Sequence, residues 1–205
     1  EILKVDPGMR YKLRHVPHGI DTMEFYPLPE EHIRAIRAEK FQCGPDEFLI
    51  ANVNRNSSRK DIPRTLMFYE ELKKRFKQTR LYLHMQDNEE NYRGYDIGRI
   101  LRHNEDTMYG VATPQDFSAD NNLPVEALNL IYNCADMIVS TTLGEGFGLS
   151  TIEAMAAKTL VMMPDNTSIS ELIEDERGIS VKCGETINDW VICKFDLGYK
   201  RPLAD

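Results

Sequence analysis

The regular alternation of apolar, β-rich runs with helical segments is the feature that most constrains the fold of this chain. Runs that predict strands lie at residues 48–53 (FLIANV), 81–85 (LYLHM), 107–112, 137–142 (MIVSTT), 160–163 (LVMM) and 178–182 (GISVK). Helical patterns lie between or after them, at residues 64–77, 124–135, 148–158 and 168–174. This alternation predicts an α/β fold, a parallel sheet with crossover helices on both faces. In such sheets ligands bind outside the carboxyl ends of the strands, so we expect the site in the segments after residues 53, 112 and 142.

Charge and residue usage exclude several classes of partner. The formal net charge is −8, which disfavours nucleic acid and requires a local basic cluster for any anionic ligand. No apolar run approaches the ~20 residues of a membrane span. The four cysteines form no C-x-x-C pair and are typical of reduced thiols in a cytoplasmic protein. The histidines lack metal-ligand spacing, so we expect no metal site.

A glycine-rich segment, GEGFGLSTIEAMA at residues 144–156, follows the strand predicted at residues 137–142. Gly146 and Gly148 allow a ligand to approach the backbone closely, and the helix that begins there presents unpaired N–H groups and a positive dipole end. The segment therefore predicts an anion site that suits a diphosphate, with Glu145 and Glu153 beside it. An alternative stays open, in which Ser150 and Glu153 form a capping box and Glu145 is a surface charge.

A second polar segment, NRNSSRKD at residues 54–61, follows the first predicted strand and reaches the same edge of the sheet. Two cations beside a helix N-terminus would neutralise a diphosphate through charge-assisted hydrogen bonds. Arg55 and Lys60 are the candidates. We interpret Arg59 as a solvated surface charge.

The segment EGFGLSTIEAMA resembles the E-x7-E motif of retaining family-four glycosyltransferases (glycosyl transferases group 1). The resemblance implies the C-terminal, Rossmann-like domain of a GT-B fold, which binds a nucleoside-diphosphate sugar and needs no other cofactor. It also implies roles: Glu145 lies against the donor sugar, Glu153 holds the ribose, and Arg55 and Lys60 clamp the diphosphate in catalysis. The backbone contacts to sugar and phosphate would come from Gly146, Phe147, Gly148, Leu149 and Ser150.

Weaker similarities to this family extend over residues 15–183. Residues 15–27 resemble its linker, with His18 in place of the usual asparagine. Residues 160–171 resemble its next strand and loop, with residues 166–168 (NTS) in place of a glycine pair. The family resemblance also places nucleobase contacts near Val111.

The domain organisation that we expect follows from the same resemblance. Residues 1–30 would be an interdomain linker and domain entry, and residues 31–205 the nucleotide-sugar-binding domain. We expect the chain to be a part of a longer protein whose N-terminal acceptor domain and C-terminal helices are absent. The acceptor, a glycan, lipid or protein, and any peripheral membrane contact would belong to that other domain.

Other functions compete with a transferase. A GT-B-shaped epimerase or phosphorylase would also bind phosphate at helix N-termini. However, the acid/base residues of an epimerase and the cofactor lysine of a phosphorylase are not recognisable in the sequence. A dinucleotide-binding oxidoreductase would need G-x-G-x-x-G after the first strand, where residues 51–55 hold no glycine. A noncatalytic nucleotide-sugar-binding module stays open as an alternative.

Overall fold

A computed structural model describes residues 6–87, 94–105, 108–114, 123–185, 190–192 and 200–204. Its centre is a six-stranded sheet in the order β3-β2-β1-β4-β5-β6, and every neighbouring pair is parallel. The strands are β1 (Phe48–Val53), β2 (Thr79–His84), β3 (Val111–Ala112), β4 (Met137–Val139), β5 (Leu160–Pro164) and β6 (Ile179–Val181). The expected α/β, Rossmann-like parallel sheet is confirmed.

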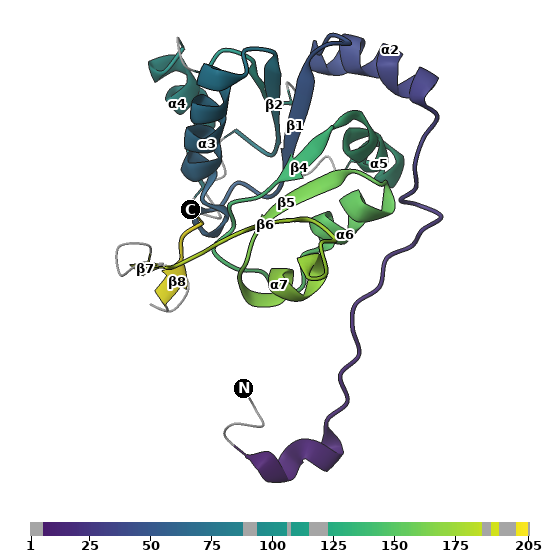
Figure 1. Ribbon diagram of the computed structural model, residues 1–205, viewed down its shortest axis with the longest axis vertical. Coiled ribbons are helices and arrows are strands. Elements are labelled where there is room, and N and C mark those ends of the chain that lie inside the picture. Colours follow the sequence, from purple (N-terminus) through teal and green to yellow (C-terminus); the bar gives the residue numbers. More distant parts are fainter. Residues whose placement is uncertain are drawn as a thin grey trace.

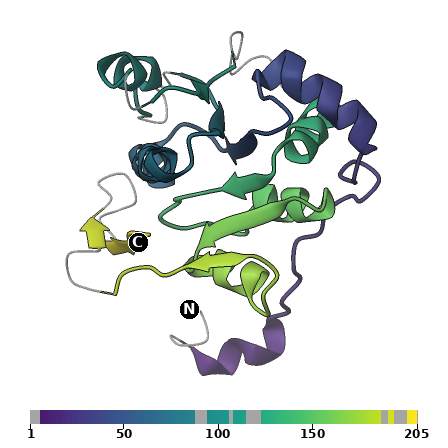
Figure 2. The same cartoon turned by 45° about the horizontal axis from the view of Figure 1, so that its top comes forward.

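Helices cover both faces of this sheet (Figures 1 and 2). They are α2 (Glu30–Phe41), α3 (Ile62–Arg75), α4 (Ile97–His103), α5 (Val125–Cys134), α6 (Leu149–Ala156) and α7 (Thr167–Ile173). Helices α2, α5, α6 and α7 pack on the face of Leu49, Ala51 and Val53. Helices α3 and α4 pack on the opposite face, which carries Ile50. The period-2 alternation of strand side chains thus divides the core into two clusters.

Strand β4 is shorter than predicted. It ends at Val139, and residues 140–142 lie outside the strand. These three polar residues are buried, and their hydroxyls bond to loops. Thr141 Oγ1 donates to the carbonyl oxygens of Lys60 and Asp61, at 3.2 and 2.8 Å. The β-branched run favours a strand, but these tertiary hydrogen bonds redirect the chain into the loop that leads to α6.

Two helices and a hairpin were not predicted. In α2 the apolar Ile33, Ile36 and Phe41 are scattered among charged residues, so the helical pattern is weak. Helix α4 has seven residues. The hairpin pairs β7 (Trp190–Ile192) with β8 (Lys200–Pro202), and Arg64 of α3 binds the carbonyl oxygen of the nearby Ala204 at 2.7 Å.

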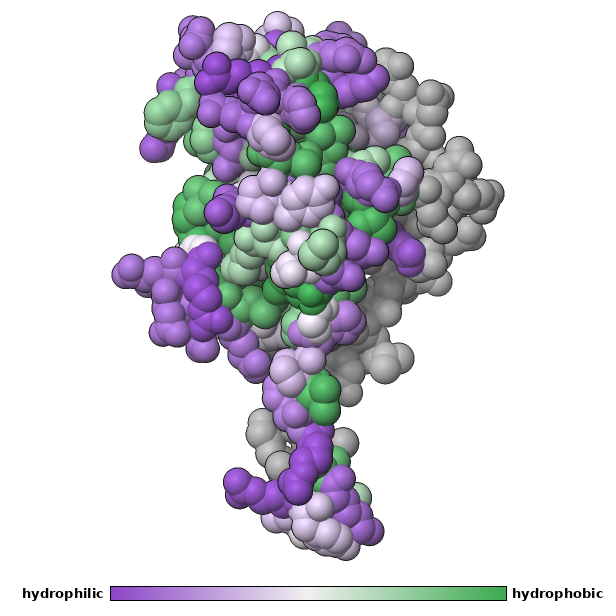
Figure 3. Space-filling model, turned by 90° about the vertical axis from the view of Figure 1, so that its right-hand side faces the viewer, coloured by the Kyte–Doolittle hydropathy of each residue, from purple (hydrophilic) through white to green (hydrophobic). Residues whose placement is uncertain are grey.

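The N-terminal segment reaches α2 along the outside of the domain (Figure 1). It begins with the 3-10 helix η1 (Pro7–Lys12), which has no buried residue and projects beyond the rest of the molecule (Figure 3). Phe25 is the point where this segment enters the core, with 6% of its surface exposed.

Three further structural findings concern the described residues only. Cys43, Cys134 and Cys183 are free thiols, and Cys193 lies outside the described residues. None of the described helices is both long and apolar enough to cross a membrane. Within the same part of the chain, no group of three or more His, Cys, Asp or Glu side chains could hold a metal ion.

Candidate anion site at the carboxyl edge of the sheet

Strands β1 and β4 form the topological switch point of the sheet. They are neighbours, but the chain leaves β1 towards β2 and leaves β4 towards β5, on opposite sides. Open α/β sheets bind ligands at the carboxyl ends of the strands that form such a switch point. The loops at these ends are residues 54–61 and 140–148. The first is the polar segment singled out in the sequence, and the second includes the start of the glycine-rich segment.

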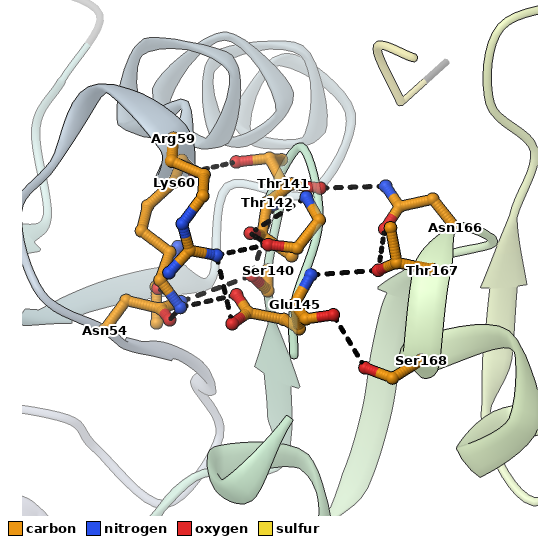
Figure 4. A network of polar contacts seen from close by, with 12 residues as sticks. Asn54, Arg59, Lys60, Ser140, Thr141, Thr142, Glu145, Asn166, Thr167 and Ser168 are labelled. Atoms are coloured by element: carbon orange, nitrogen blue, oxygen red, sulfur yellow. Dashed lines mark hydrogen bonds and ion pairs between the residues drawn. The ribbon is translucent and has the colours of Figure 1, made fainter. Parts of the chain in front are cut away.

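An ion pair between Lys60 and Glu145 joins these two loops (Figure 4). Lys60 Nζ lies 2.5 Å from Glu145 Oε1, and the two side chains are only 11% and 14% exposed. Lys60 Nζ also donates to Asn54 Oδ1 at 2.6 Å. Arg59 Nη1 lies 3.1 Å from the other carboxylate oxygen of Glu145. The site thus holds a carboxylate between two cations.

Burial and charge oppose each other in this pair. Burial lowers the pKa of Lys60, and attraction to Glu145 offsets only part of that effect. Burial alone would raise the pKa of Glu145, but the interactions with Lys60, with Thr142 and with Arg59 outweigh it and lower the pKa. Glu145 is therefore held ionised, whereas the Lys60 ammonium lies where a further anion would stabilise it.

The interpretation of Arg59 as a solvated charge was wrong. Its guanidinium donates to the carbonyl oxygen of Gly144 as well as reaching Glu145, and its own carbonyl accepts from Leu143 N at 2.9 Å. The short 3-10 helix η2 (Ser58–Lys60) lies against the loop after β4, so both adjacent cations meet that loop. Their adjacency in the sequence was the signal that could have found Arg59.

Buried Asn56 anchors the loop that carries these cations. Its side-chain nitrogen donates to the carbonyl oxygens of Gln86, Asp87 and Tyr95, at 3.0, 3.1 and 2.7 Å. Asp61 follows η2 with a left-handed φ of 46° and turns the chain into α3. The position of Lys60 is thus fixed by backbone geometry on both sides.

The glycines of the motif differ in what they do. Gly148 is the N-cap of α6 with a φ of 98°, and a Cβ there would meet Ile169 Cδ1 at 2.6 Å. A Cβ on Gly146 would meet nothing within 4 Å. Gly148 is therefore required by the fold, whereas Gly146 leaves open space in front of the loop.

Glu153 does not form the capping box that the sequence left open. Helix α6 begins at Leu149 after Gly148, and no side chain caps it. Glu153 Oε2 instead accepts from the Tyr132 hydroxyl at 2.5 Å. Burial raises the pKa of Glu153, and the Tyr132 hydrogen bond opposes that shift. This carboxylate is thus oriented by α5 and stays half-buried beside the first turns of α6.

Residues 166–168, where the resemblance leads us to expect a glycine pair, bind the backbone of Glu145. Glu145 N donates to Thr167 Oγ1 at 2.9 Å, and Ser168 Oγ donates to Glu145 O at 3.0 Å (Figure 4). Asn166 Nδ2 donates to Thr142 O at 3.0 Å. The sequence did not predict this clamp, because its partners are far apart along the chain.

Two of the predicted site residues lie away from the central ion pair. Arg55 is exposed on the turn after β1, yet near enough for its charge to contribute to lowering the pKa of Lys60, after burial as the main cause. Val111 is in edge strand β3, which β2 separates from β1. Leu149 and Ser150 form the first turn of α6 beside Gly148.

The fold is an α/β domain, and the cluster of Lys60, Arg59 and Glu145 at its switch point is a candidate anion site. Comparisons with known proteins give a family match over part of the chain. Residues 121–191 match the family model described as glycosyl transferases group 1, and this span contains both Glu145 and Glu153. No curated protein sequence matches the chain.

Solved structures with a similar fold include GT-B glycosyltransferases. Sucrose-phosphate synthase from Thermosynechococcus elongatus has a TM-score of 0.65 at 22% identity, over 87% of this chain and 43% of that one. The C-terminal domain of a glycosyl transferase group 1 family protein, LpcC from Francisella tularensis, has a TM-score of 0.61 at 21% identity, over 80% of both chains. HepE from Anabaena, in complex with UDP-glucose, has a TM-score of 0.65 at 19% identity, over 87% of this chain and 46% of that one. The chain spans less than half the length of sucrose-phosphate synthase and HepE.

Proposed function

We propose that this chain is the donor-binding, C-terminal domain of a GT-B glycosyltransferase. It binds a nucleoside-diphosphate sugar at the carboxyl ends of β1 and β4. Together with a second Rossmann-like domain, it transfers the sugar to an acceptor with retention of configuration and without a metal ion. The observation that carries the proposal is the Lys60–Glu145 ion pair at the switch point, inside a site that also contains Arg59 and the glycine N-cap of α6.

The Lys60 ammonium has a hydrogen-bonding capacity that suits a phosphate. An ammonium has three N–H donors, and Glu145 and Asn54 take two of them. The third can bind a diphosphate oxygen without breaking the ion pair. The anion would also relieve the burial cost that lowers the pKa of Lys60. Exposed Arg55 and the N–H groups at the start of α6 supply further positive potential, so the leaving diphosphate needs no Mg²⁺.

Glu145 would orient the sugar. Lys60 and Arg59 keep the carboxylate ionised, and an ionised carboxylate accepts hydrogen bonds from sugar hydroxyls. The clamp from Thr167 and Ser168 fixes its backbone. Glu153, oriented by Tyr132, would accept from the ribose hydroxyls. Preorganised positioning of this kind, rather than covalent work, is what the site supplies to catalysis.

A thermal-shift panel tests donor binding. UDP-glucose, GDP-mannose and ADP-glucose are added to the chain with and without EDTA, and stabilisation by any of them measures binding to the folded state. We expect one nucleotide class to raise the melting temperature, and EDTA to leave the shift unchanged. If no donor stabilises the chain, or if stabilisation requires a divalent ion, the proposed site is wrong.

A transfer assay tests the rest of the proposal with the full-length protein. We expect a product with retained anomeric configuration, read by NMR, and no more than trace transfer by these 205 residues alone. An inverted product would contradict the retaining mechanism. Donor binding without transfer by the full-length protein would favour a noncatalytic nucleotide-sugar-binding module.

A further inference from the structure

The densest run of positive charge in the sequence lies at the amino end of β2, at the opposite end of the strands from the anion site. Residues 73–80, with the sequence KKRFKQTR, contain five cations and no acid, in a chain whose net charge is −8. They form the last turn of α3, the turn that follows it and the start of β2. In Figure 1 this end of the sheet lies at the top, whereas helix η1 lies at the bottom. We call residues 73–80 the basic edge.

Most of the charge of the basic edge is not neutralised within the chain. Glu71 lies 2.6 Å from Lys74, and Glu47 lies 2.8 Å from Arg80. Among the residues that the structure describes, no carboxylate forms an ion pair with the other three cations, which are Lys73, Arg75 and Lys77. A helix dipole favours cations in its last turn, but Lys77 lies beyond the helix and is exposed. Positive charge is therefore available to a partner at this end of the molecule.

Three aromatic side chains are exposed at the same place. Tyr109, Phe76 and Phe48 are 67%, 61% and 42% exposed, so each leaves apolar surface in water that a partner would bury. Their backbones meet around Thr79. Phe48 is the register partner of Thr79, and the Thr79 hydroxyl donates to the carbonyl oxygen of Phe76. The Tyr69 hydroxyl donates to the Tyr109 carbonyl oxygen at 2.8 Å and lies 3.1 Å from that of Thr79.

The Tyr109 ring is in contact with two of the cations. Lys73 Nζ lies 5.5 Å from the ring centroid, and the guanidinium carbon of Arg80 lies 5.8 Å from it. Cations over a ring reduce the aromatic surface on which a nucleobase could stack. A tyrosine with an apolar ring and a polar hydroxyl is instead typical of the headgroup level of a membrane. The aromatic residues of the basic edge thus suit a lipid surface.

The surroundings of the basic edge favour a flat anionic partner over a strand of nucleic acid. Single strands are bound in positively charged grooves. The hollow that borders this edge beside Phe48 is lined by two guanidinium groups and by four carboxylates, those of Glu30, Asp46, Glu47 and Asp136. A strand that followed this hollow would meet acids. A lipid surface touches one end of the protein only, and its field decays over about 10 Å, so the acidic remainder of the chain lies outside it.

We propose that the basic edge docks on an anionic lipid surface. Lys73, Arg75 and Lys77 attract the headgroups, and the Phe76 ring enters the interface between headgroups and acyl chains. The six residues of β1 span about 20 Å, so the anion site at the other end of the strands stays in water. A membrane contact would then lie on this domain, whereas the sequence led us to expect it on another domain. The proposal does not depend on the function proposed above.

Co-sedimentation with vesicles tests this proposal. The chain is mixed with vesicles of phosphatidylcholine alone, or of phosphatidylcholine with about a third of phosphatidylglycerol. We expect binding to the anionic vesicles only, in about 0.1 M NaCl, and its loss in about 1 M NaCl, where the Debye length falls to about 3 Å. Arg75→Gln combined with Lys77→Gln should lower the affinity by about 30-fold, or about fivefold for each cation. Phe76→Ser should lower it by about tenfold, because its ring no longer leaves water.

The matched controls are on helix η1, at the other end of the molecule (Figure 1). Arg10→Gln combined with Lys12→Gln changes the net charge by the same amount, and Tyr11→Ser removes a ring that is 75% exposed. Both controls should keep the vesicle affinity within about twofold of the unmodified chain. Melting temperatures show whether each variant is folded.

Three results would overturn the proposal. The first is that the unmodified chain does not bind the anionic vesicles. The second is an equal loss in the η1 controls and in the variants of the basic edge, since binding would then follow net charge and not this surface. The third comes from fluorescence anisotropy with a single-stranded oligouridylate. If the RNA binds through Arg75 and Lys77 and the vesicles do not, the basic edge is a nucleic-acid site.

Discussion

One partly buried ion pair lies at the amino ends of strands β1 and β4, and another lies at their carboxyl ends. The two pairs differ in how many of their hydrogen-bonding groups already have partners. At the amino ends, Arg37 of α2 binds Asp136 through two parallel hydrogen bonds, both of 2.8 Å. Arg37 Nη2 also donates to Glu47 O at 2.8 Å, and Asp136 Oδ2 also accepts from Leu49 N at 2.7 Å. At the carboxyl ends, Lys60 meets Glu145 through a single bond.

This difference is the reason why we interpret the first pair as structural and propose the second as ligand-binding. A guanidinium and a carboxylate in bidentate geometry saturate each other, and the bond to Asp136 raises the pKa of Arg37 further. A lysine is a point charge with spare donors, so it can take a ligand while it keeps its partner. A cavity of about 700 Å³ lies at the amino ends beside Arg37 and Asp136. Hydrogen-bonding capacity, and not cavity volume, is the reason to place the proposed site at the carboxyl ends.

Arg37→Met should have the largest effect on stability and none on ligand binding. It leaves Asp136 partly buried without its cation, and the Arg37 side chain is only 15% exposed. We expect the free energy of unfolding to fall by about 3 kcal/mol, measured by urea denaturation. The matched control is Arg34→Met, whose side chain is 72% exposed and should cost less than about 0.5 kcal/mol. A weaker affinity for a donor in folded Arg37→Met would contradict the separation between the two ends.

Lys60→Met should show the reverse pattern. Arg59 remains beside Glu145 as a second cation, so the free energy of unfolding should fall by less than it does in Arg37→Met. Affinity for UDP should fall by about 10- to 150-fold, the value of one charged hydrogen bond, while affinity for uridine stays the same. Arg55→Ala should act in the same direction, and Lys40→Met is an exposed control. Equal losses for UDP and uridine in calorimetry would mean that Lys60 does not bind the diphosphate.

Acid should lower the free energy of unfolding through His84, the last residue of β2. Burial lowers the pKa of His84 from 6.5 to about 4. Between these values the unfolded chain takes up a proton that the folded protein does not, so stability falls as the pH falls through this window. The loss from pH 7 to pH 5 is about 2 kcal/mol by linkage. His84→Gln should reduce the difference between unfolding free energies at the two pH values by that amount, and the exposed-site variant His32→Gln should not.

The smallest effects are expected at the two motif glycines. Substitution of Gly148 should affect stability, and substitution of Gly146 should affect ligand binding. Gly148→Ala forces a side chain into left-handed backbone and towards Ile169, and should lower the free energy of unfolding by about 1–2 kcal/mol. Gly146→Ala has open space and should leave stability unchanged, but its methyl group would occupy the volume that a donor needs. Melting temperatures with and without a sugar nucleotide measure both effects. An unchanged ligand-induced shift in Gly146→Ala would indicate that the ligand does not approach this glycine.

The sequence by itself determined the parallel α/β architecture and the approximate strands, because alternating apolar runs and helical patterns are local signals with a fixed period. It also placed Lys60 and Glu145 on loops at one edge, since the carboxyl ends of parallel strands lie together. Tertiary structure alone decided the end of β4 at Val139, the role of Arg59, and the partner of Glu153. Each of these depends on contacts between residues far apart in the sequence. A hydroxyl or carboxylate that has several possible partners binds the one that lies nearest in the folded chain. Periodicity carries no information about that choice, so the sequence left the capping box open and gave no sign that Tyr132 binds Glu153.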